Sequence, residues 1–596
     1  MTSRGIILKS AILVLIAFGL MILAPTHDVQ KAQAAPSYWI TWANNAWRYF
    51  QPDIGVIRST GLSTAGLGYP YFTEWDLGTY IFAILDAEKI GILPRTGDWG
   101  STYRLDKVMN FLSTRTLTSY STSYLWYSSN TGAPQGSDET NVSDLGFLLI
   151  ALETLRTYRP EYASAINGVI ARENITRFAS SSELWGITSG LYKWYVAHGF
   201  KFFGFDTYAP VQEALNTLQT ILSGPQLQTY GVTLPVTWLT SEPLLLAAFT
   251  ISPEPGFANL VLNSYQAQQN RYVATAKFTA FSEGNTGNPT PPGYPSYIYE
   301  WIVTGGGQTW TITPWEVTPI IYIKVGFGFY GLLGTQYALN LINYVNAFFT
   351  DWSSGYWDGV DENGRVVNNV IDRTQGIILA AARYALEKKT SSISLGVSAG
   401  SIALGASVTL SGTLTPTEPF PGIPVGALVS LSCSFDGTSW MTFITTKTGS
   451  GGAYSIAWYP PYPGTYQLKA SWSGDSNYEG CTSSTGSLTV TGTFPPRIAI
   501  LVLGPASAVV GGSVTFDVIV TNPGSAISTT LYFEVFGPGG YWYFDTQKVS
   551  LTTGERGRFQ FVWKIPLTAG AGQYRVFVGL IPPKPTAIAQ TQITVL

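Results

Sequence analysis

The sequence predicts a multidomain protein in which an all-α (α/α)6 toroid is followed by two all-β sandwiches. Three observations support this prediction. The chain has 596 residues, more than one hydrophobic core holds, which indicates several domains. Apolar residues recur with a helical period up to residue 389, and from about Thr390 they alternate with polar residues as in strands. Helix-start motifs recur within the helical part, which indicates a ring of paired helices.

The first 34 residues have the pattern of a secretory signal peptide. Arg4 and Lys9 form a positive segment, residues 11–23 are apolar, and residues 32–34 read Ala-Gln-Ala, a cleavage motif. We therefore expect cleavage after this motif and a protein that is secreted or exposed at the cell surface. The alternative is an uncleaved membrane anchor, because about 18 residues from Gly5 onward nearly span a bilayer.

Composition excludes several classes of function. Charged residues make up only 12% of the chain and the net charge is −3, so no basic surface for nucleic acid is expected. Removal of the leader leaves His198 as the only histidine, in an aromatic stretch that predicts packing, so a multi-histidine zinc site is excluded and no cofactor is expected. The only cysteines, Cys433 and Cys481, lie in one segment of a chain with an export signal. We expect a disulfide between them, with two free thiols as the alternative.

The predicted toroid spans residues 35–389 and holds about twelve helices, separated by Gly-, Pro- and Ser-rich loops. One long loop, near residues 279–313, is rich in aromatic residues and is expected to be functional. The two sandwiches are assigned to residues 390–493 and 494–596. The expected helices lie near residues 38–50, 74–91, 102–117, 143–158, 161–178, 189–203, 209–224, 242–250, 255–272, 314–331, 335–350 and 369–388.

Acidic residues stand at the expected helix starts or in the long loop: Asp76, Asp144, Glu242, Glu283 and Glu316. Each is explained on its own as a cap, because a carboxylate in the first helical turn accepts backbone N–H bonds. In a toroid, however, several helix starts face one cleft. Glycosidic bond hydrolysis needs two carboxyl groups, one of them protonated, and requires neither histidine nor metal. As a set, these residues favour glycoside chemistry.

Several stretches resemble, in the same order, the exported bacterial and archaeal family called domain of unknown function 3131. They include "SEPLLLAAF", "YVATAKFTAFSEG", "KVGFGFYGLLGTQYA" and "GYWDGVDENGR". That family is similar to glucoamylase-like toroidal enzymes, among them β-1,2-glucan hydrolases. The resemblance implies that Glu242, in "SEPLLLAAF", is a general acid and that Glu283 lies on a substrate loop. The sequence departs from the family at "DRTQG", residues 372–376, which leaves the role of Asp372 open.

The other site residues are assigned by position. Asp144 or Asp76, at neighbouring helix starts, is expected to act as base or nucleophile, and Glu283 competes for that role. Replacement of Glu242 by Gln is expected to leave stability within about 1 kcal/mol. Five aromatic residues are assigned to substrate binding: Trp75, Tyr297, Tyr299, Trp301 and Trp357.

The two β segments resemble known exported modules. The first, with "SLSCSFDGTSW", resembles bacterial immunoglobulin-like repeats, and the second, with "VTFDVIVTNPG", resembles a cell-adhesion-related β-domain. The leading hypothesis is an exported glycoside hydrolase or transglycosylase that acts on a β-glucan-like or envelope polysaccharide, with envelope association through the sandwiches. The alternative is a non-catalytic glycan-binding or cell-surface structural protein.

Overall fold

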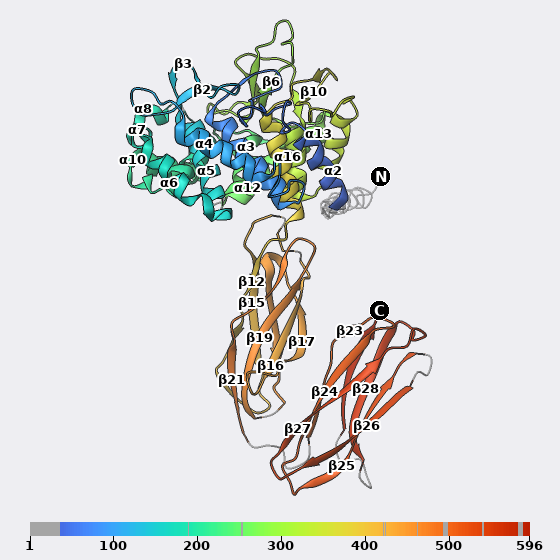
Figure 1. Ribbon diagram of the computed structural model, residues 1–596. Coiled ribbons are helices and arrows are strands. Elements are labelled where there is room, and N and C mark those ends of the chain that lie inside the picture. The colour runs from blue at the N-terminus through green and yellow to red at the C-terminus, as the bar shows by residue number, and fades with distance from the viewer. Residues whose placement is uncertain are drawn as a thin grey trace, which may run out of the picture. The chain divides into compact units, whose positions relative to one another are not determined.

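The computed structural model describes residues 36–596 except 187, 189, 252–253, 255, 421, 424, 462, 493–498, 539–541 and 582–587. The chain forms two compact units that divide between Glu387 and Lys388. Helices dominate the first unit, and the second is built of strands (Figure 1). The expected signal peptide lies outside the described residues. Among the helices that are described, none is long and apolar enough to cross a membrane.

Six helices of the first unit form a closed inner ring. Each packs against the next along the chain, and the last returns to the first. Helices α5 and α12 are apolar on nearly every side, as expected for helices that are covered all round. The ring helices are α3 (Glu74–Lys89), α5 (Val142–Tyr158), α9 (Gly190–Phe202), α12 (Ser241–Thr250), α14 (Ile323–Leu333) and α16 (Asp372–Leu386).

A second layer of helices covers this ring. Helix α2 packs on α16, α4 on α3, α6 on α5, α10 and α11 on α9, and α15 on α14. Helix α13 reaches α12 through Gln268 Nε2, which donates to Ser241 Oγ at 3.1 Å. This double ring is the architecture of an α/α toroid. The outer helices are α2 (Pro36–Trp47), α4 (Ser101–Thr114), α6 (Ala163–Arg172), α10 (Ala209–Leu215), α11 (Thr217–Ser223), α13 (Phe257–Thr275) and α15 (Gln336–Asn346), with short α7 (Ile175–Ser180) and α8 (Ser182–Gly186).

Small antiparallel sheets occupy the loops of the helical unit, and Figure 1 shows β2, β3, β6 and β10 at one end of it. The sheets are β1 (Tyr71–Phe72) with β2 (Tyr124–Ser128) and β3 (Pro134–Glu139); β4 (Gln226–Thr229) with β5 (Val232–Pro235); β6 (Glu283–Asn285) with β7 (Tyr297–Val303) and β8 (Thr309–Thr313); and β9 (Ile320–Tyr322) with β10 (Gly359–Asp361) and β11 (Val366–Val367). These strands differ from the expectation, because their segments fall in predicted loops or, for β9, in a predicted helix.

Three expected helices differ from the structure. The helix expected over 314–331 is wrong in its first half, because Ile320–Tyr322 forms β9 and pairs with β10, and α14 begins only at Ile323. Its β-branched residues favour a strand. The helix expected over 209–224 divides into α10 and α11 at Asn216, and that expected over 161–178 divides into α6 and α7.

The second unit contains two β-sandwiches in which two sheets enclose an apolar core. In the first, β15 pairs with β12, β13 and β18, opposite a sheet in the order β14-β21-β19-β16-β17 with β20 beside β19. The immunoglobulin-like assignment stays a prediction. The strands are β12 (Ser391–Ile393), β13 (Gly396–Val397), β14 (Ser401–Ala403), β15 (Val408–Pro416), β16 (Leu428–Ser434), β17 (Met441–Lys447), β18 (Ala453–Trp458), β19 (Gly464–Gly474), β20 (Glu479–Thr482) and β21 (Gly486–Thr491).

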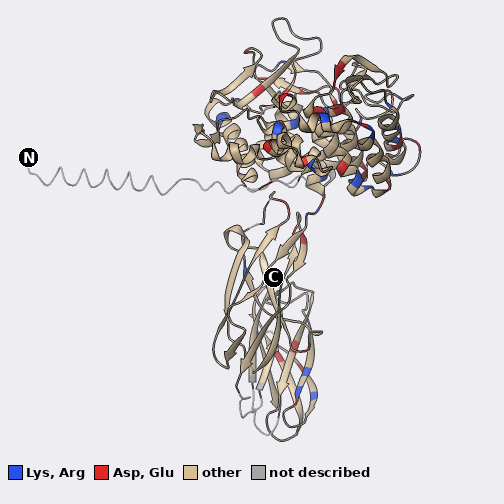
Figure 2. Cartoon of the chain, turned by 90° about the vertical axis from the view of Figure 1, so that its left-hand side faces the viewer, with Lys and Arg blue, Asp and Glu red and all other residues tan. Residues whose placement is uncertain are grey.

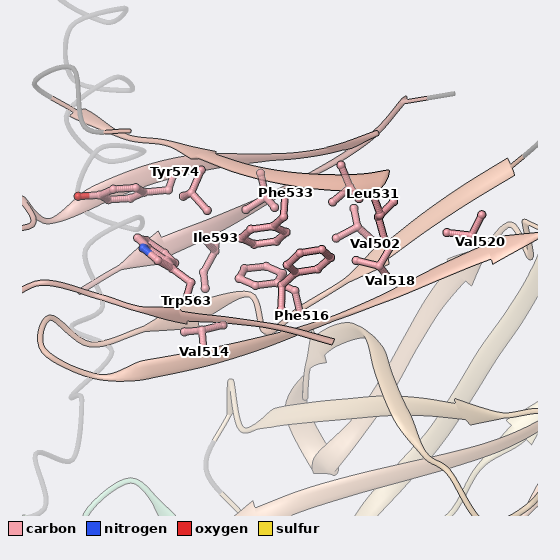
Figure 3. Close-up of a cluster of buried hydrophobic side chains, with 14 of the residues drawn as sticks. Val502, Val514, Phe516, Val518, Val520, Leu531, Phe533, Trp563, Tyr574 and Ile593 are labelled. Atoms are coloured by element: carbon pink, nitrogen blue, oxygen red, sulfur yellow. The ribbon is translucent and has the colours of Figure 1, made fainter. Parts of the chain in front are cut away.

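The second sandwich packs the sheet β22-β24-β27 against the sheet β23-β29-β28-β25-β26. Its core is aromatic: Phe533 stacks on Phe561 at a ring-centroid distance of 4.9 Å, and Phe516, Trp563 and Tyr574 lie in the same layer (Figure 3). The strands are β22 (Ala499–Leu503), β23 (Ser507–Ala508), β24 (Ser513–Thr521), β25 (Ile527–Phe536), β26 (Trp542–Leu551), β27 (Arg556–Lys564), β28 (Gly572–Ile581) and β29 (Ile588–Val595).

The expected disulfide between Cys433 and Cys481 is wrong, because both residues are free thiols. Cys433 lies in β16 opposite Leu468 of β19, and Cys481 lies in β20 opposite Trp472 of β19. Strands β16 and β20 pair with opposite edges of β19, since Ser471 has a partner in each. Two strand spacings amount to about 9.6 Å, which exceeds the Cα–Cα distance of about 7 Å that a disulfide can bridge.

Candidate active site

Helix caps place the acidic residues at the start of two ring helices. Thr73 and Asp76 form a capping box at α3, in which Thr73 N donates to Asp76 Oδ2 at 2.7 Å. Asn141 caps α5: Asp144 N donates to Asn141 Oδ1 at 2.9 Å, and Asn141 Nδ2 donates to Asp144 Oδ2 at 3.0 Å. The capping interpretation is therefore confirmed for both helices, and it leaves one oxygen of the Asp144 carboxyl free of the cap.

A cavity of about 440 Å³ opens at these helix starts. Its lining includes two of the predicted carboxyl groups, Asp144 and Glu283, and one cation, Arg373. Figure 2 shows acidic and basic residues among the helices of this unit. The other lining residues are aromatic or polar: Trp75, Asn141, Ser143, Thr188, Tyr192, Tyr299 and Trp301.

The carboxyl group of Asp144 has a pKa close to neutral pH. Burial raises the pKa of its carboxyl to about 7, and the nearby charges of Asp76 and Glu74 add to the rise, while Arg373 opposes it. The residue is 9% exposed and lines the cavity, so a bound molecule can reach the carboxyl. A group whose pKa lies near the working pH is an effective general acid or base.

Glu283 stands across the β6–β7 pairing from Tyr299. The hydroxyl of Tyr192, on α9, donates to Glu283 Oε1. Burial raises the pKa of Glu283, the neighbouring Glu242 raises it further, and Arg373 and Lys324 oppose the rise. Glu283 is thus a buried carboxyl group that is held in one orientation at the wall of the cavity.

Glu242 is placed differently from the expectation. Its side chain forms an ion pair with Lys324, and both side chains are at most 1% exposed. Lys324 Nζ also donates to the backbone oxygen of Glu283 at 2.8 Å. Glu242 is not among the residues that line the large cavity; it borders a neighbouring cavity of about 20 Å³ between the ring helices.

This position has two consequences for the predictions made on Glu242. The Glu242 carboxyl is paired with Lys324 and does not line the large cavity, so it is not placed to donate a proton to a ligand there. Removing one partner of a buried ion pair costs about 3–5 kcal/mol, so the expectation that Glu242→Gln leaves stability within about 1 kcal/mol no longer holds. Glu242 does lie in the first turn of α12, as the capping interpretation expected, but Lys324 Nζ rather than a backbone N–H donates to its carboxyl.

Asp76 lies beside the cavity without lining it. Its carboxyl interacts with that of Asp372, at the start of α16, and with Arg373 Nε at 3.8 Å. Burial raises the pKa of both carboxyl groups, and in Asp372 the charge of Asp76 adds to the rise. Asp76 and Asp372 are therefore two interacting carboxyl groups next to Arg373.

The predicted aromatic residues separate into two groups. Trp75, Tyr299 and Trp301 line the cavity, and the rings of Tyr299 and Trp301 are parallel at 5.7 Å. Tyr297 is next to Tyr299 on the same face of β7, and Arg373 Nη1 donates to its hydroxyl at 3.2 Å. Trp357 packs instead against Phe349 and is absent from the lining residues of the cavity.

Two further predictions fall outside the cavity. Glu316 follows β8 on an exposed loop rather than opening a helix, and it accepts a bond from Ile312 N at 3.3 Å. His198 is buried on α9 with Nδ1 3.0 Å from Trp194 O, and burial lowers its pKa. This histidine is packed, as its aromatic surroundings predicted.

Sequence reasoning missed Tyr192, Arg373, Lys324 and Asp358. Lys324 had a signal, because it is a single lysine in an apolar run, and lysine is rarely buried without a partner. Asp358 is fully buried beside it; Thr374 Oγ1 donates to its Oδ1 at 2.6 Å, and burial raises its pKa to about 7. Tyr192 and Arg373 had no signal, because only the ring closure brings α9 and α16 to Glu283.

Comparisons with solved structures give matches of low similarity. A "putative glucoamylase" from Bacteroides caccae ATCC 43185 is 12% identical, with a TM-score of 0.42, over 59% of this chain and 94% of that one. A "putative glucoamylase" from Bacteroides fragilis NCTC 9343 is 13% identical, with a TM-score of 0.43, over 60% and 93%. An endo-β-1,2-glucanase from Talaromyces funiculosus in complex with β-1,2-glucan is 13% identical, with a TM-score of 0.43, over 58% and 84%.

No curated protein matches the chain. The family model of DUF3131, described as a protein of unknown function, matches residues 41–388, which include the double ring except for the first turn of α2 and make up more than half of the chain. On this match the chain belongs to the DUF3131 family.

Proposed function

We propose that the cavity cleaves or transfers glycosidic bonds of a β-glucan-like or cell-envelope polysaccharide. Asp144 is the proton donor, and Glu283 is the second carboxyl group, acting as base or nucleophile. One observation carries the proposal: Asp144 and Glu283, both with raised pKa values, line the same aromatic cavity. Glycosidases generally place two carboxyl groups on either side of the scissile bond and keep one of them protonated.

The electrostatics support this division of roles. Asp144 has a pKa of about 7 and is partly protonated at neutral pH, as a general acid requires. The pKa of Glu283 is also raised, by burial and by the charge of Glu242, but the bond from the Tyr192 hydroxyl and the charges of Arg373 and Lys324 offset part of that rise. The two residues thus provide two carboxyl groups in one cavity, and the base or nucleophile role of Glu283 is part of the proposal.

The remaining walls suit a sugar. Trp75, Tyr299 and Trp301 offer apolar ring faces, and Ser143 and Thr188 offer hydroxyl groups that can bond to a ligand. Tyr299 is 40% exposed although it is aromatic, so the core does not account for its position. A mixture of apolar faces with a few polar groups is typical of a site that binds a small polar ligand.

The test is hydrolysis of a polysaccharide panel that includes β-1,2-, β-1,3- and β-1,4-glucans, with release of reducing ends as the readout. Asp144→Asn and Glu283→Gln should each lower turnover at least about 100-fold. Asp138→Asn is a matched control, because Asp138 is exposed on β3 outside the cavity, and it should leave turnover unchanged. Full turnover in both cavity variants would overturn the assignment of roles.

The non-catalytic alternative makes a different prediction. A wild-type protein that binds a polysaccharide in affinity electrophoresis without cleaving it would support the glycan-binding function. Loss of turnover in Glu242→Gln alone, with Asp144→Asn fully active, would return the general acid to Glu242. The ion pair with Lys324 makes this second outcome unexpected.

We also propose that the protein is secreted or exposed at the cell surface, with the sandwiches contributing to envelope association. The support is the leader-like pattern of residues 1–34. N-terminal sequencing of the protein recovered from the medium or the envelope tests this proposal. A start immediately after Ala34 is expected, and recovery only from the cytosol with Met1 intact would contradict it.

A further inference from the structure

A second aromatic cluster lies on the sheet β1-β2-β3, outside the residues that line the cavity. The ring of Tyr69 contacts the rings of Tyr71 and Trp126 edge-on, at centroid distances of 5.3 and 5.6 Å. Tyr69 is 47% exposed, and Tyr71 and Trp126 are partly exposed. We call these three residues the outer cluster.

Strand alternation explains why the outer cluster faces outward. Phe72 pairs with Tyr127, and both are buried against the ring of Phe111. Because neighbouring residues of a strand point to opposite faces, Tyr71 and Trp126 lie on the other face of the sheet. The core on the inner face is therefore complete without the outer cluster, and packing alone does not account for its three rings.

The chain continues from each edge strand of this sheet into residues that line the cavity. Strand β1 continues through the cap Thr73 into Trp75, which lines the cavity. Strand β3 continues through Thr140, whose Oγ1 donates to Glu74 at 2.7 Å, into the lining residue Asn141. Tyr69 also stands only four residues before Thr73, the N-cap of α3, so the outer cluster lies close to the start of that helix.

The outer cluster and the β7 aromatic residues stand on different sides of the cavity. Trp301 contacts the segment before α12, where the ring of Trp238 packs edge-on against it at a centroid distance of 4.9 Å, and Tyr299 stacks on Trp301. The outer cluster stands before α3, and α3 and α12 are three places apart in the ring of six helices. Aromatic surfaces therefore flank the carboxyl groups from two directions.

We propose that Tyr69, Tyr71 and Trp126 form an outer subsite that binds the same polysaccharide chain as the cavity. This inference rests on the proposed function. The occupant is a neutral glycan, because the cluster offers aromatic ring faces and two tyrosine hydroxyl groups and contains no charged side chain that would hold an ionic ligand. A chain that reaches from the cavity to this subsite is longer than one that fills the cavity alone.

The experiment compares long and short substrates of the same linkage. In Tyr69→Ala, the KM for the polymer should rise about 10-fold, as expected for the loss of one buried aromatic face. The kcat on the polymer, and kcat/KM on a trisaccharide, should stay within about twofold because the carboxyl groups are untouched. Trp126→Ala should behave in the same way. Tyr158→Ala is the matched control, because Tyr158 is 37% exposed at the opposite end of α5.

Binding separates failure of this inference from failure of the proposed function. In an Asp144→Asn background, affinity electrophoresis in gels that contain the polymer reports binding without cleavage. Weaker retention of the Tyr69→Ala and Trp126→Ala proteins supports the subsite, and unchanged retention and unchanged KM in both variants overturn it while the cavity function stands. A wild-type protein that neither binds nor cleaves any member of the panel overturns both.

Discussion

Buried carboxyl groups of the helical unit and turn carboxyl groups of the sandwich unit have pKa values that are shifted in opposite directions. In the sandwiches, Asp436 and Glu555 accept bonds from backbone N–H groups at exposed turns, and these bonds lower their pKa values. In the helical unit, burial is the largest cause of raised pKa values at eight carboxyl groups: Asp76, Asp86, Asp144, Glu173, Glu283, Glu300, Asp358 and Asp372.

This difference in pKa shifts separates apolar side chains that are buried for stability from ionisable side chains that are buried for function. The hydrophobic clusters of the sandwich cores consist of aliphatic and aromatic side chains, whose burial stabilises the fold. The ring interior keeps ionisable groups where their charged forms are disfavoured, which lowers stability. Groups of this kind concentrate at functional sites, because catalysis needs shifted pKa values. The contrast supports placing the chemistry in the helical unit.

The largest expected effect on stability comes from the pair Glu242–Lys324. Glu242→Gln and Lys324→Met should each lower the free energy of unfolding of the helical unit by about 3–5 kcal/mol, because each leaves the other group buried without its partner. Hydrogen exchange followed by mass spectrometry, with peptides from α12 and α14, reports this unit separately from the sandwiches.

A matched control and a double variant make this prediction sharper. Glu183→Gln, at an exposed residue of α8, should change stability by less than about 0.5 kcal/mol. The variant with both Glu242→Gln and Lys324→Met should lose much less than the sum of the single losses, because neither charge is left unpaired. Additive losses would show that the two side chains do not interact.

The second prediction concerns pH. A carboxyl group with a raised pKa binds more protons in the folded state than in the unfolded state, so stability falls as pH rises between the unfolded and folded pKa values. For Asp144 this window runs from about pH 4 to about pH 7. Between these values we expect the helical unit to lose stability while the sandwiches stay nearly constant, because the lowered pKa values of Asp436 and Glu555 stabilise the folded state only as pH rises toward the ordinary carboxyl pKa of about 4.

Asp144→Asn tests the source of this pH dependence. The variant should reduce the fall in stability of the helical unit by on the order of 2 kcal/mol, because the amide does not ionise. Denaturant titrations at pH 4, 5.5 and 7, read by hydrogen exchange in each unit, measure it. If the unfolding free energies of the two units change equally with pH across this range, the contrast between the units does not exist.

The sequence predicted those parts of the fold that depend on periodicity and local capping. Thr73 with Asp76 and Asn141 with Asp144 were recognisable because a cap needs residues three positions apart. The strand β9 was missed because its apolar residues Ile320, Ile321 and Tyr322 continue directly into the helical pattern of α14. Periodicity alone does not separate such short segments.

The site was predictable only as a list of candidates. Asp144 and Glu283 could be chosen as acidic residues at helix starts or in a long loop, but their shared cavity depends on ring closure. The roles of Arg373 and Tyr192 depend on contacts between residues far apart in the chain, such as Tyr192 with Glu283. The pairing of Glu242 with Lys324 was not predictable for the same reason, because Lys324 is 82 residues away.

A smaller effect on stability is expected from substitution of Arg365, whose side chain fixes the loop that follows Glu283. Arg365 Nη1 donates to Thr286 O at 2.7 Å, Nε donates to Asp361 at 2.9 Å, and the guanidinium lies 4.8 Å from the ring centroid of Tyr294. Arg365→Ala should cost about 1–2 kcal/mol and increase hydrogen exchange in residues 286–296.

The matched control for Arg365 is an arginine whose pairing is exposed. Arg58 bonds to Asp53 at 2.6 Å, but both side chains are 60% exposed, so Arg58→Ala should change stability by less than about 1 kcal/mol. If the two arginine variants lose equal stability and exchange in 286–296 is unchanged, the loop is held by other contacts.

The smallest expected effect is at the cysteines, where a reductant should change nothing. A disulfide closing a loop of this length would contribute about 4 kcal/mol, and Cys433 and Cys481 form none. We therefore expect the unfolding midpoint of the sandwiches to be the same with and without dithiothreitol.

Iodoacetamide should label partly exposed Cys481 in the native protein. Cys433 should react only after unfolding, because it is 3% exposed and burial raises the pKa of its thiol to about 12. Cys481→Ser should stay within about 0.5 kcal/mol of the wild type. Protection of both thiols until reduction would mean that the strand register around β19 differs from the one observed.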